Sequence, residues 1–278
     1  PVRTLDELLA ADVDAVIVTT PSGVHREAVV PALQCGKAVF VEKPLSRGID
    51  DAWKIVDAAE NSGTVCAVGY QWRALDDLIS IPLDQEGSVP ALMVSQGVGI
   101  TQARTWFKDD RLSGGLIFER VSHHIDLQRM IAGEVGSVSA VRGGIALSGR
   151  ADPVETEDDV LSLTLHFLSG AIGVICVGWT PERHPSTQSL SLHTTRGSFD
   201  LSLDPDFVMT DISGVLKAQR APEHPFRRQM RSFLDAVRNN DQSLVQCSAK
   251  DAAGTVAVAL AAASSLAGSG DQRPVQRR

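Results

Sequence analysis

Several features are missing from this sequence of 278 residues, and each absence excludes a class of protein. No run of lysines and arginines could follow a phosphate backbone, and the formal net charge of -8 disfavours a nucleic-acid surface. No apolar run reaches the length of a membrane span. The four cysteines (Cys35, Cys66, Cys176 and Cys247) show no CxxC spacing. We therefore predict no metal site, no disulfide and a reducing, cytoplasmic compartment.

A phosphate-binding glycine motif and an initiating methionine are also missing. The motif GxGxxG occurs nowhere, and the chain begins at Pro1 without a signal-like segment. Residues 15–19 have the composition of a central parallel strand, which would form an exposed apolar edge if nothing preceded it. We therefore expect an upstream segment of roughly 50–60 residues that carries the phosphate loop and an acidic ribose ligand. A signal peptide could also lie upstream.

Three short apolar segments organise the first part of the chain. Residues 15–19, 38–41 and 64–69 are too short for helices and apolar on both faces, as buried parallel strands are. Predicted helices over 22–35 and 49–61 connect them, and Pro31 should kink the first helix or separate its last turn. This alternation predicts that residues 1–70 are the C-terminal half of a Rossmann dinucleotide-binding domain, with the first half missing.

The pattern changes in residues 71–278, which we predict to form a substrate-binding and oligomerisation domain. A loop-rich region to about residue 99 precedes a helix over 113–132. Five strand-like runs follow without helices between them, so the sheet should be mainly antiparallel and open. Helices over 225–239 and 249–267, which could pack back on the first domain, precede a tail that should fray. The fold class is therefore α/β plus α+β.

Two local patterns could carry chemistry. The strand at 38–41 ends at Glu42-Lys43-Pro44, which places a lysine at the sheet edge where ligands bind in α/β proteins. Glu119 lies one helical turn before His123, and a carboxylate in that position can make an imidazole a better general base. On a helical wheel Asp126 lies on the same side. Each pattern alone is more typical of a solvated surface.

Together, these segments resemble the Gfo/Idh/MocA oxidoreductases, a family that includes glucose–fructose oxidoreductase and inositol dehydrogenase. The resemblance extends from Leu5 to about Leu266. It rests on the segments DAVIVTTP, GKAVFVEKPL and GYQWR, and on SGG followed by Glu119 and His123. Two positions depart from the family pattern, since Glu119 replaces the commoner aspartate and Val121 replaces a glycine.

The resemblance implies roles for the matched residues. The catalytic residues would be Lys43, His123 and Glu119. The residues beside the cofactor would be Thr20, Pro21, Ser22, His25, Glu42 and Lys43. The residues that bind substrate would be Arg73, Trp106, Asp126 and Trp179. The two tryptophans could equally be core residues.

The predicted activity is that of a dehydrogenase dependent on NAD or NADP, with the choice of cofactor left open. It would transfer a hydride between the nicotinamide and a hydroxyl carbon of a sugar, inositol or related polyol. His123 would accept the hydroxyl proton, and Lys43 would stabilise charge on the oxygen. The alternatives are an NAD-assisted glycosidase and a non-catalytic NAD- or sugar-sensing regulator. A homodimer or homotetramer is expected through the antiparallel sheet.

Overall fold

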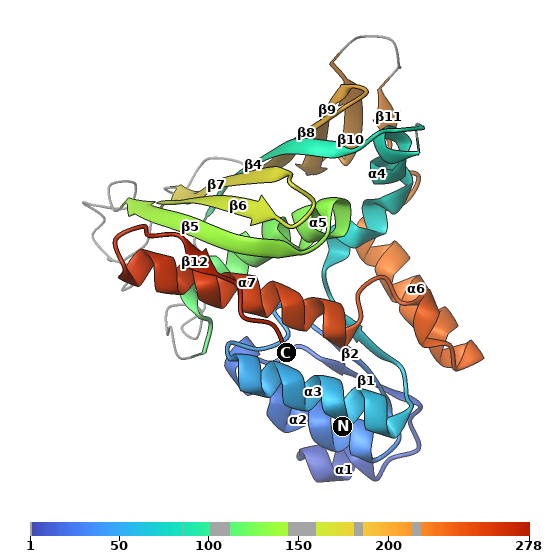
Figure 1. The fold of residues 1–278 in the computed structure, drawn as a ribbon. Helices are drawn as coiled ribbons and strands as arrows, with labels where there is room; N and C mark the ends of the chain where they lie inside the picture. Colours follow the sequence, from blue (N-terminus) through green and yellow to red (C-terminus); the bar gives the residue numbers. More distant parts are fainter. Residues whose placement is uncertain (1, 85, 101–111, 144–159, 181–185, 213–217) are drawn as a thin grey trace.

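The computed structural model describes residues 2–84, 86–100, 112–143, 160–180, 186–212 and 218–278. Two sheets organise this part of the chain (Figure 1), a parallel sheet of three strands and a larger sheet of nine. The predicted fold class is confirmed, because a Rossmann-like parallel sheet is followed by a mixed, mostly antiparallel one. Among the helices of the described residues, none is both long and apolar enough to cross a membrane.

The small sheet has the strand order β1-β2-β3, with β1 (Ala15–Val18), β2 (Ala38–Val41) and β3 (Cys66–Val68) all parallel. Every residue of β2 is buried, as its continuous apolar run predicts. β1 lies at the edge of the sheet, and Ile17 is 55% exposed there. The carboxyl ends of β1 and β2 therefore form one shared edge.

Three helices accompany the small sheet: α1 (Leu5–Leu9), α2 (His25–Gln34) and α3 (Ile49–Ser62). A short 3₁₀ turn, η1 (Ser22–Val24), precedes α2. The predicted separation of the last turn of α2 is wrong, because the helix continues through Pro31. Val29, Ala32 and Leu33 around this proline are fully buried, so the packing of α2 outweighs the one backbone hydrogen bond that proline removes.

The large sheet has the order β11-β10-β9-β8-β4-β7-β6-β5-β12. Its only parallel pair among the described strands is β4 with β7. The strands are β4 (Pro90–Ile100), β5 (Val135–Gly143), β6 (Val160–Phe167), β7 (Ile172–Thr180), β8 (Thr187–Thr194), β9 (Ser198–Asp204), β10 (Val208–Asp211), β11 (Gln219–Arg220) and β12 (Arg273–Pro274).

The sequence pattern missed β4, which lies between β7 and β8 in the large sheet. Gly97 and Gly99 weaken the strand pattern there. In the structure these glycines face the helices, where side chains of other elements occupy the space a Cβ would need. The glycines of β4 therefore accommodate side chains that belong to the candidate site.

The remaining helical segments are η2 (Gln71–Leu75), α4 (Asp76–Leu83), η4 (Ile117–Val121), α5 (Ser122–Ala132), α6 (Pro225–Asn239), η5 (Gln242–Leu244) and α7 (Ala249–Ala267). Helices α5 and α7 lie on one face of the large sheet (Figure 1). Helix α7 also packs against α3 of the small sheet. On α6, Phe233 packs edge-on against Phe40 of β2, with ring centroids 5.6 Å apart.

Helix α6 contacts its neighbours over a narrow face around Phe233, and its Phe226 and Leu234 side chains are 51% and 41% exposed. The prediction of a frayed C-terminal tail is wrong. The tail does not fray, since β12 pairs with β5 and the Arg278 guanidinium donates to the Asp57 carboxylate over 2.7 Å.

Candidate functional site

The helix that carries His123 begins with a π-helical turn, η4. The Ser122 N–H bonds to the carbonyl of Ile117, five residues earlier, so the backbone advances less per residue than in an α-helix. A wheel at 100° per residue therefore misplaces residues across this turn. Glu119 and His123 line one cavity, whereas Asp126 does not line it and pairs with Arg73. Turns of this type occur frequently at functional sites.

Lys43 extends from the end of β2 to this π-turn. Its ammonium donates to the backbone carbonyl of Glu119 over 2.9 Å and to Glu119 Oε2 over 3.1 Å. The lysine and glutamate side chains are only 15% and 7% exposed. An ion pair this poorly solvated holds both groups in place, because loss of either partner would leave a buried charge. The pair joins the edge of the small sheet to the helix beneath the large one.

His123 lies beside this ion pair and lines the cavity. Its ring contacts Tyr70 edge-on and Trp72 at a tilt, with centroid distances of 5.8 Å and 5.1 Å. Burial lowers the pKa of His123 well below its ordinary value, and the positive charge of Lys43 lowers it further, with smaller contributions from His124 and Arg120. His123 is therefore a neutral imidazole at neutral pH. A neutral imidazole has one nitrogen that can accept a proton.

His124 has a different environment, although it is the next residue. It is fully buried, its Nε2 lies 2.9 Å from Gln188 Oε1, and it contacts Trp72 at 4.8 Å between ring centroids. Burial lowers the pKa of His124 to about 4, so the ring is neutral and Nε2 carries the proton that Gln188 accepts. His124 therefore positions a wall residue of the cavity and does not face its interior.

The cavity has a volume of about 280 Å³. Its lining combines titratable, amide and aromatic side chains, all from position 71 onward: Gln71, Trp72, Glu119, Arg120, His123, Ser186, Gln188, Leu203, Asp204, Phe207, His224 and Phe226. Sequence reasoning missed most of these residues. They come from η2, η4, β8, β9, α6 and the segments beside them, and no spacing in the sequence shows that these elements meet.

The residues predicted beside the cofactor lie at the carboxyl edge of the small sheet. Thr20 is exposed after β1, and Pro21 is half-buried at the start of the turn. The Ser22 hydroxyl donates to the backbone carbonyl of Leu112 over 3.2 Å. Burial raises the pKa of the Glu42 carboxyl, and the neighbouring Lys43 partly offsets this. Thr20, Glu42 and Lys43 thus offer hydrogen-bonding groups at one edge, whereas Ser22 holds the loop.

His25 joins the two loops that leave this edge. Its ring nitrogens lie 2.8 Å from the carbonyl of Thr20 and 3.3 Å from that of Leu45. The residue is 1% exposed, and burial lowers the pKa of its imidazole. A neutral ring can donate only one of these bonds, and the shorter distance favours Thr20 as its acceptor. His25 therefore fixes the loop geometry around the edge without presenting its ring to solvent.

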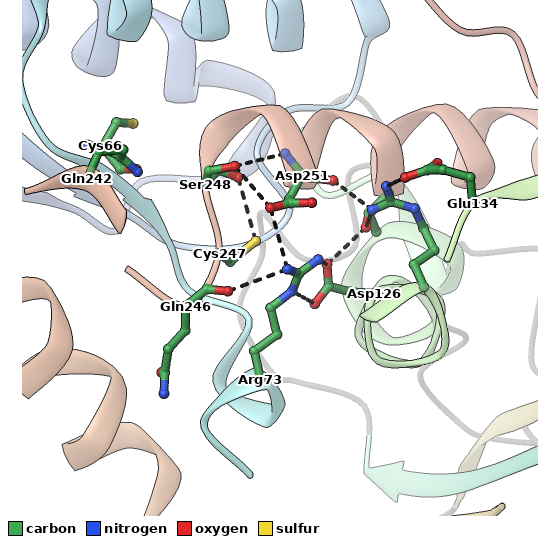
Figure 2. A network of polar contacts seen from close by, with 11 residues as sticks. Cys66, Arg73, Asp126, Glu134, Gln242, Gln246, Cys247, Ser248 and Asp251 are labelled. Atoms are coloured by element: carbon green, nitrogen blue, oxygen red, sulfur yellow. Dashed lines mark hydrogen bonds and ion pairs between the residues drawn. The ribbon is translucent and has the colours of Figure 1, made fainter. Parts of the chain in front are cut away.

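Arg73 and Asp126, predicted to bind substrate, form a buried ion pair with each other (Figure 2). Arg73 donates to both carboxylate oxygens of Asp126, over 2.8 Å and 2.9 Å. The Thr255 hydroxyl donates to the same carboxylate over 3.0 Å, and Asp251 lies 3.6 Å from the Arg73 guanidinium. Neither Arg73 nor Asp126 lines the cavity. Their polar groups are engaged between η2, α5 and α7.

Of the two tryptophans predicted to bind substrate, only Trp179 belongs to the described residues. Trp179 is 4% exposed and does not line the cavity, but the guanidinium of Arg120 lies over its ring at 4.9 Å from the centroid. It supports a lining residue through a cation–π contact. Trp106 lies outside the described residues. Within the described residues, no group of three His, Cys, Asp or Glu side chains could hold a metal ion.

Two family models match the chain. Residues 1–70 match the model described as the GFO/IDH/MocA oxidoreductase family with an NAD-binding Rossmann fold. Residues 91–200 match the model of the GFO/IDH/MocA C-terminal domain.

Curated relatives and solved structures agree with these matches. The chain is 28% identical over 222 residues to 2,7-anhydro-N-acetylneuraminate hydratase of Escherichia coli (strain K12). This alignment covers 77% of this chain and 58% of that protein. It is 22% identical over 253 residues to levoglucosan dehydrogenase of Pseudarthrobacter phenanthrenivorans. That alignment covers 77% of this chain and 64% of the dehydrogenase. The chain thus spans less than two thirds of the length of either relative. A structure of levoglucosan dehydrogenase in complex with NADH superposes with a TM-score of 0.84 at 19% identity, covering 99% of this chain and 83% of that chain, and shows the same fold.

Proposed function

Because the chain belongs to the Gfo/Idh/MocA oxidoreductase family, we propose that it takes part in hydride transfer between a nicotinamide cofactor and a hydroxyl carbon of a sugar, inositol or related polyol. One observation carries this proposal most directly. A neutral histidine, His123, lines a polar cavity beside a Lys43–Glu119 ion pair that extends from the carboxyl edge of the parallel sheet. Ligands of such sheets bind at that edge.

The residues at the sheet edge fit the nicotinamide half of a dinucleotide. Thr20, Glu42 and Lys43 offer a hydroxyl, a carboxyl and an ammonium group, which suit the amide and ribose hydroxyls of that half. Gly69 leaves room for the Glu42 carboxyl, which lies 3.0 Å from the position a Cβ would take. NADH in the levoglucosan dehydrogenase complex supports this choice of cofactor, with NADP as the alternative.

In the proposed reaction His123 acts as the general base. The substrate hydroxyl loses its proton to the unprotonated ring nitrogen of His123, and the carbon loses a hydrogen with its electron pair. The cofactor, when bound, supplies the hydride acceptor. The low pKa of His123 keeps the ring ready to accept a proton at neutral pH.

Lys43 and Glu119 provide the electrostatic setting for this step. The ammonium group of Lys43 stabilises negative charge as it develops on the substrate oxygen. Glu119 holds that ammonium group through its carboxylate and its carbonyl, which fixes the lysine close to the base. The same positive charge favours the neutral form of His123 before the reaction begins.

Replacement of the proposed catalytic residues in the full-length protein tests the mechanism. We expect His123→Asn and Lys43→Met each to lower kcat/KM by about 10²- to 10⁴-fold in assays of NAD(P)H formation with a polyol panel. In Lys43→Met alone, the buried Glu119 carboxylate loses its partner. The double variant Lys43→Met/Glu119→Gln removes this unpaired charge and so measures the loss of the ammonium group by itself. His166→Gln on β6, which does not line the cavity, is the matched control. Near-normal turnover in the His123 variant would exclude it as the base.

The hydratase relative supports a second candidate, in which the nicotinamide is reduced and then oxidised again within one cycle. His123 and Lys43 would serve such a reaction in the same way, because the first step is again hydride removal. Accumulation of free NADH during turnover supports the dehydrogenase. Product formation from anhydro sugars or glycosides without net NADH supports the alternative.

The outer face of the large sheet is our proposed surface for self-association. Leu92, Val98, Val141 and Val160 are exposed on its strands. Apolar side chains exposed on a sheet face provide a surface against which a second copy of the chain can pack. Light scattering of the full-length protein should give the mass of a dimer or tetramer, and a monomeric mass would contradict the proposal.

A further inference from the structure

We propose that the substrate carries a carboxylate, so that the cavity binds a sugar acid and Arg120 is the residue that recognises its charge. This inference rests on the proposed function, because it specifies the substrate class of the same cavity. The observations that carry it are the position of Arg120 in the lining, its lack of a charge partner, and a glycine that makes room for it.

Arg120 is a cation without an adequate counter-charge. It lines the cavity, yet no ion pair joins it to any described residue, and its Nη1 atom is buried without a hydrogen-bond partner there. A buried guanidinium normally has carboxylate or carbonyl acceptors, because desolvation of an unpaired charge is costly. Burial lowers the pKa of Arg120 to about 10, so the group nevertheless remains charged at neutral pH.

The other charged groups among the described lining residues do not neutralise Arg120. Glu119 already pairs with Lys43 at 3.1 Å. Asp204 acts on Arg120 electrostatically, but it forms no ion pair with it and is only partly buried, so solvent screens much of its charge. His123 is neutral. An anionic group of the substrate would therefore form the ion pair with Arg120 that the described residues do not provide.

Gly99 of β4 accommodates the guanidinium of Arg120. A Cβ at position 99 would overlap the terminal atoms of Arg120, so any larger residue would displace the group. On its other side the guanidinium lies over the ring of Trp179. The arginine is thus held in one place by packing, and its hydrogen-bonding capacity is not used by the described residues. Such an arrangement is suited to a ligand group.

The position of Arg120 favours the substrate over the cofactor as the source of the anion. All lining residues follow position 70, and none belongs to the small sheet where the cofactor edge lies. A single carboxylate also fits better than a phosphate. Among the described residues, the cavity lining contains no second arginine and no lysine, and a dianionic phosphate is normally bound by several donors.

A comparison of matched sugars in the full-length protein tests the inference. The substrates are glucose, galactose and mannose with their uronic acids, each assayed with NAD and with NADP. We expect at least one uronate to have a kcat/KM at least tenfold above that of its parent hexose. Arg120→Gln should lower this uronate-to-hexose ratio by about 10- to 100-fold, the range of a charge-assisted hydrogen bond.

Two glycine variants test whether the preference for uronates depends on the position of the Arg120 guanidinium and not only on its presence. Gly99→Ala should lower the same ratio, because it displaces the guanidinium without removing it. Gly143→Ala on β5 is the matched control, since a Cβ there meets only Val160 at an ordinary distance of 3.8 Å. The control should retain the wild-type ratio.

The outcomes separate this inference from the proposed function. Turnover of hexoses with no preference for uronates, or a preference that survives Arg120→Gln, overturns the inference and leaves the dehydrogenase in place. Absence of turnover with every sugar counts against the proposed function. Calorimetry then decides the inference: uronate binding that is lost in Arg120→Gln supports it, and absence of uronate binding in the wild type overturns it.

Discussion

Arg120 and Arg129 lie on the same helical segment, yet their guanidinium groups have opposite surroundings. Arg129 donates to the carbonyl of Asp251 over 2.7 Å, to the Thr255 hydroxyl over 2.9 Å and to Glu134 over 2.5 Å. Arg120 forms no ion pair with the described residues and lies against a cavity and an aromatic ring. Charge and burial alone therefore do not identify a functional arginine.

The same contrast extends to the neighbours of each arginine. We call Arg73, Asp126, Arg129, Asp251 and Thr255 the closed cluster, because its charges are paired within the protein (Figure 2). Glu119, Arg120 and His123 form the cavity cluster, in which one base and one cation have unused capacity. The difference suggests that the closed cluster holds the structure and that the cavity cluster serves the ligand.

The largest expected effect is the loss of stability when the closed cluster is broken. Arg73→Met leaves the Asp126 carboxylate buried without its bidentate partner, which should lower the free energy of unfolding by about 3–5 kcal/mol. Urea denaturation of the full-length protein measures this change. Arg73→Lys, which keeps the charge but not the bidentate geometry, should lose less. A change below about 1 kcal/mol in Arg73→Met would show that the cluster is not structural.

The matched pair Arg129→Gln and Arg120→Gln sharpens the comparison. The first variant removes charge-assisted hydrogen bonds and should cost about 2 kcal/mol of stability. The second removes an uncompensated cation, so stability should change by less than about 0.5 kcal/mol or increase. Equal losses in the two variants, measured by the same urea titrations, would contradict the proposed division between the clusters.

The smallest expected effect is a shift in the pH dependence of activity. Because burial and nearby positive charges lower the pKa of His123, the acid limb of kcat/KM should have its midpoint below pH 6.5. Removing a positive charge makes protonation of His123 easier and raises its pKa. Arg120→Gln should therefore move the acid limb to higher pH. A shift to lower pH would show that another group is titrating.

The sequence predicted the fold well where the apolar pattern is local and continuous. The run Ala38-Val39-Phe40-Val41 identifies a buried strand, and the lysine that follows it does reach the helix that carries Glu119. The pattern did not predict β4, because Gly97 and Gly99 weaken the strand signal. These glycines leave the space that side chains of other elements occupy. The pattern also gave no sign of η4, whose π-turn changes the angle between successive residues.

The candidate site was only partly predictable for a related reason. Lys43, Glu119 and His123 could be proposed from short motifs. Arg120 could not be distinguished from a solvated charge, because its lack of partners depends on β4, β7 and β9. Arg73 and Asp126 resembled binding residues because the sequence does not show that they meet each other. Long-range pairing determines which polar groups remain available.

The packing of α7 has a consequence for how ligands enter and leave. This alanine-rich helix contacts α3 beside the small sheet and β5 of the large sheet, and Ser248 at its start forms a β-bridge with Ala67. Rotation of one sheet away from the other would strip apolar surface from the helix, at a cost that grows with the area uncovered. We therefore expect both sheets to move as a single rigid unit. Exchange of ligands would then depend on local displacement of the segments that border the cavity, without a hinge between domains.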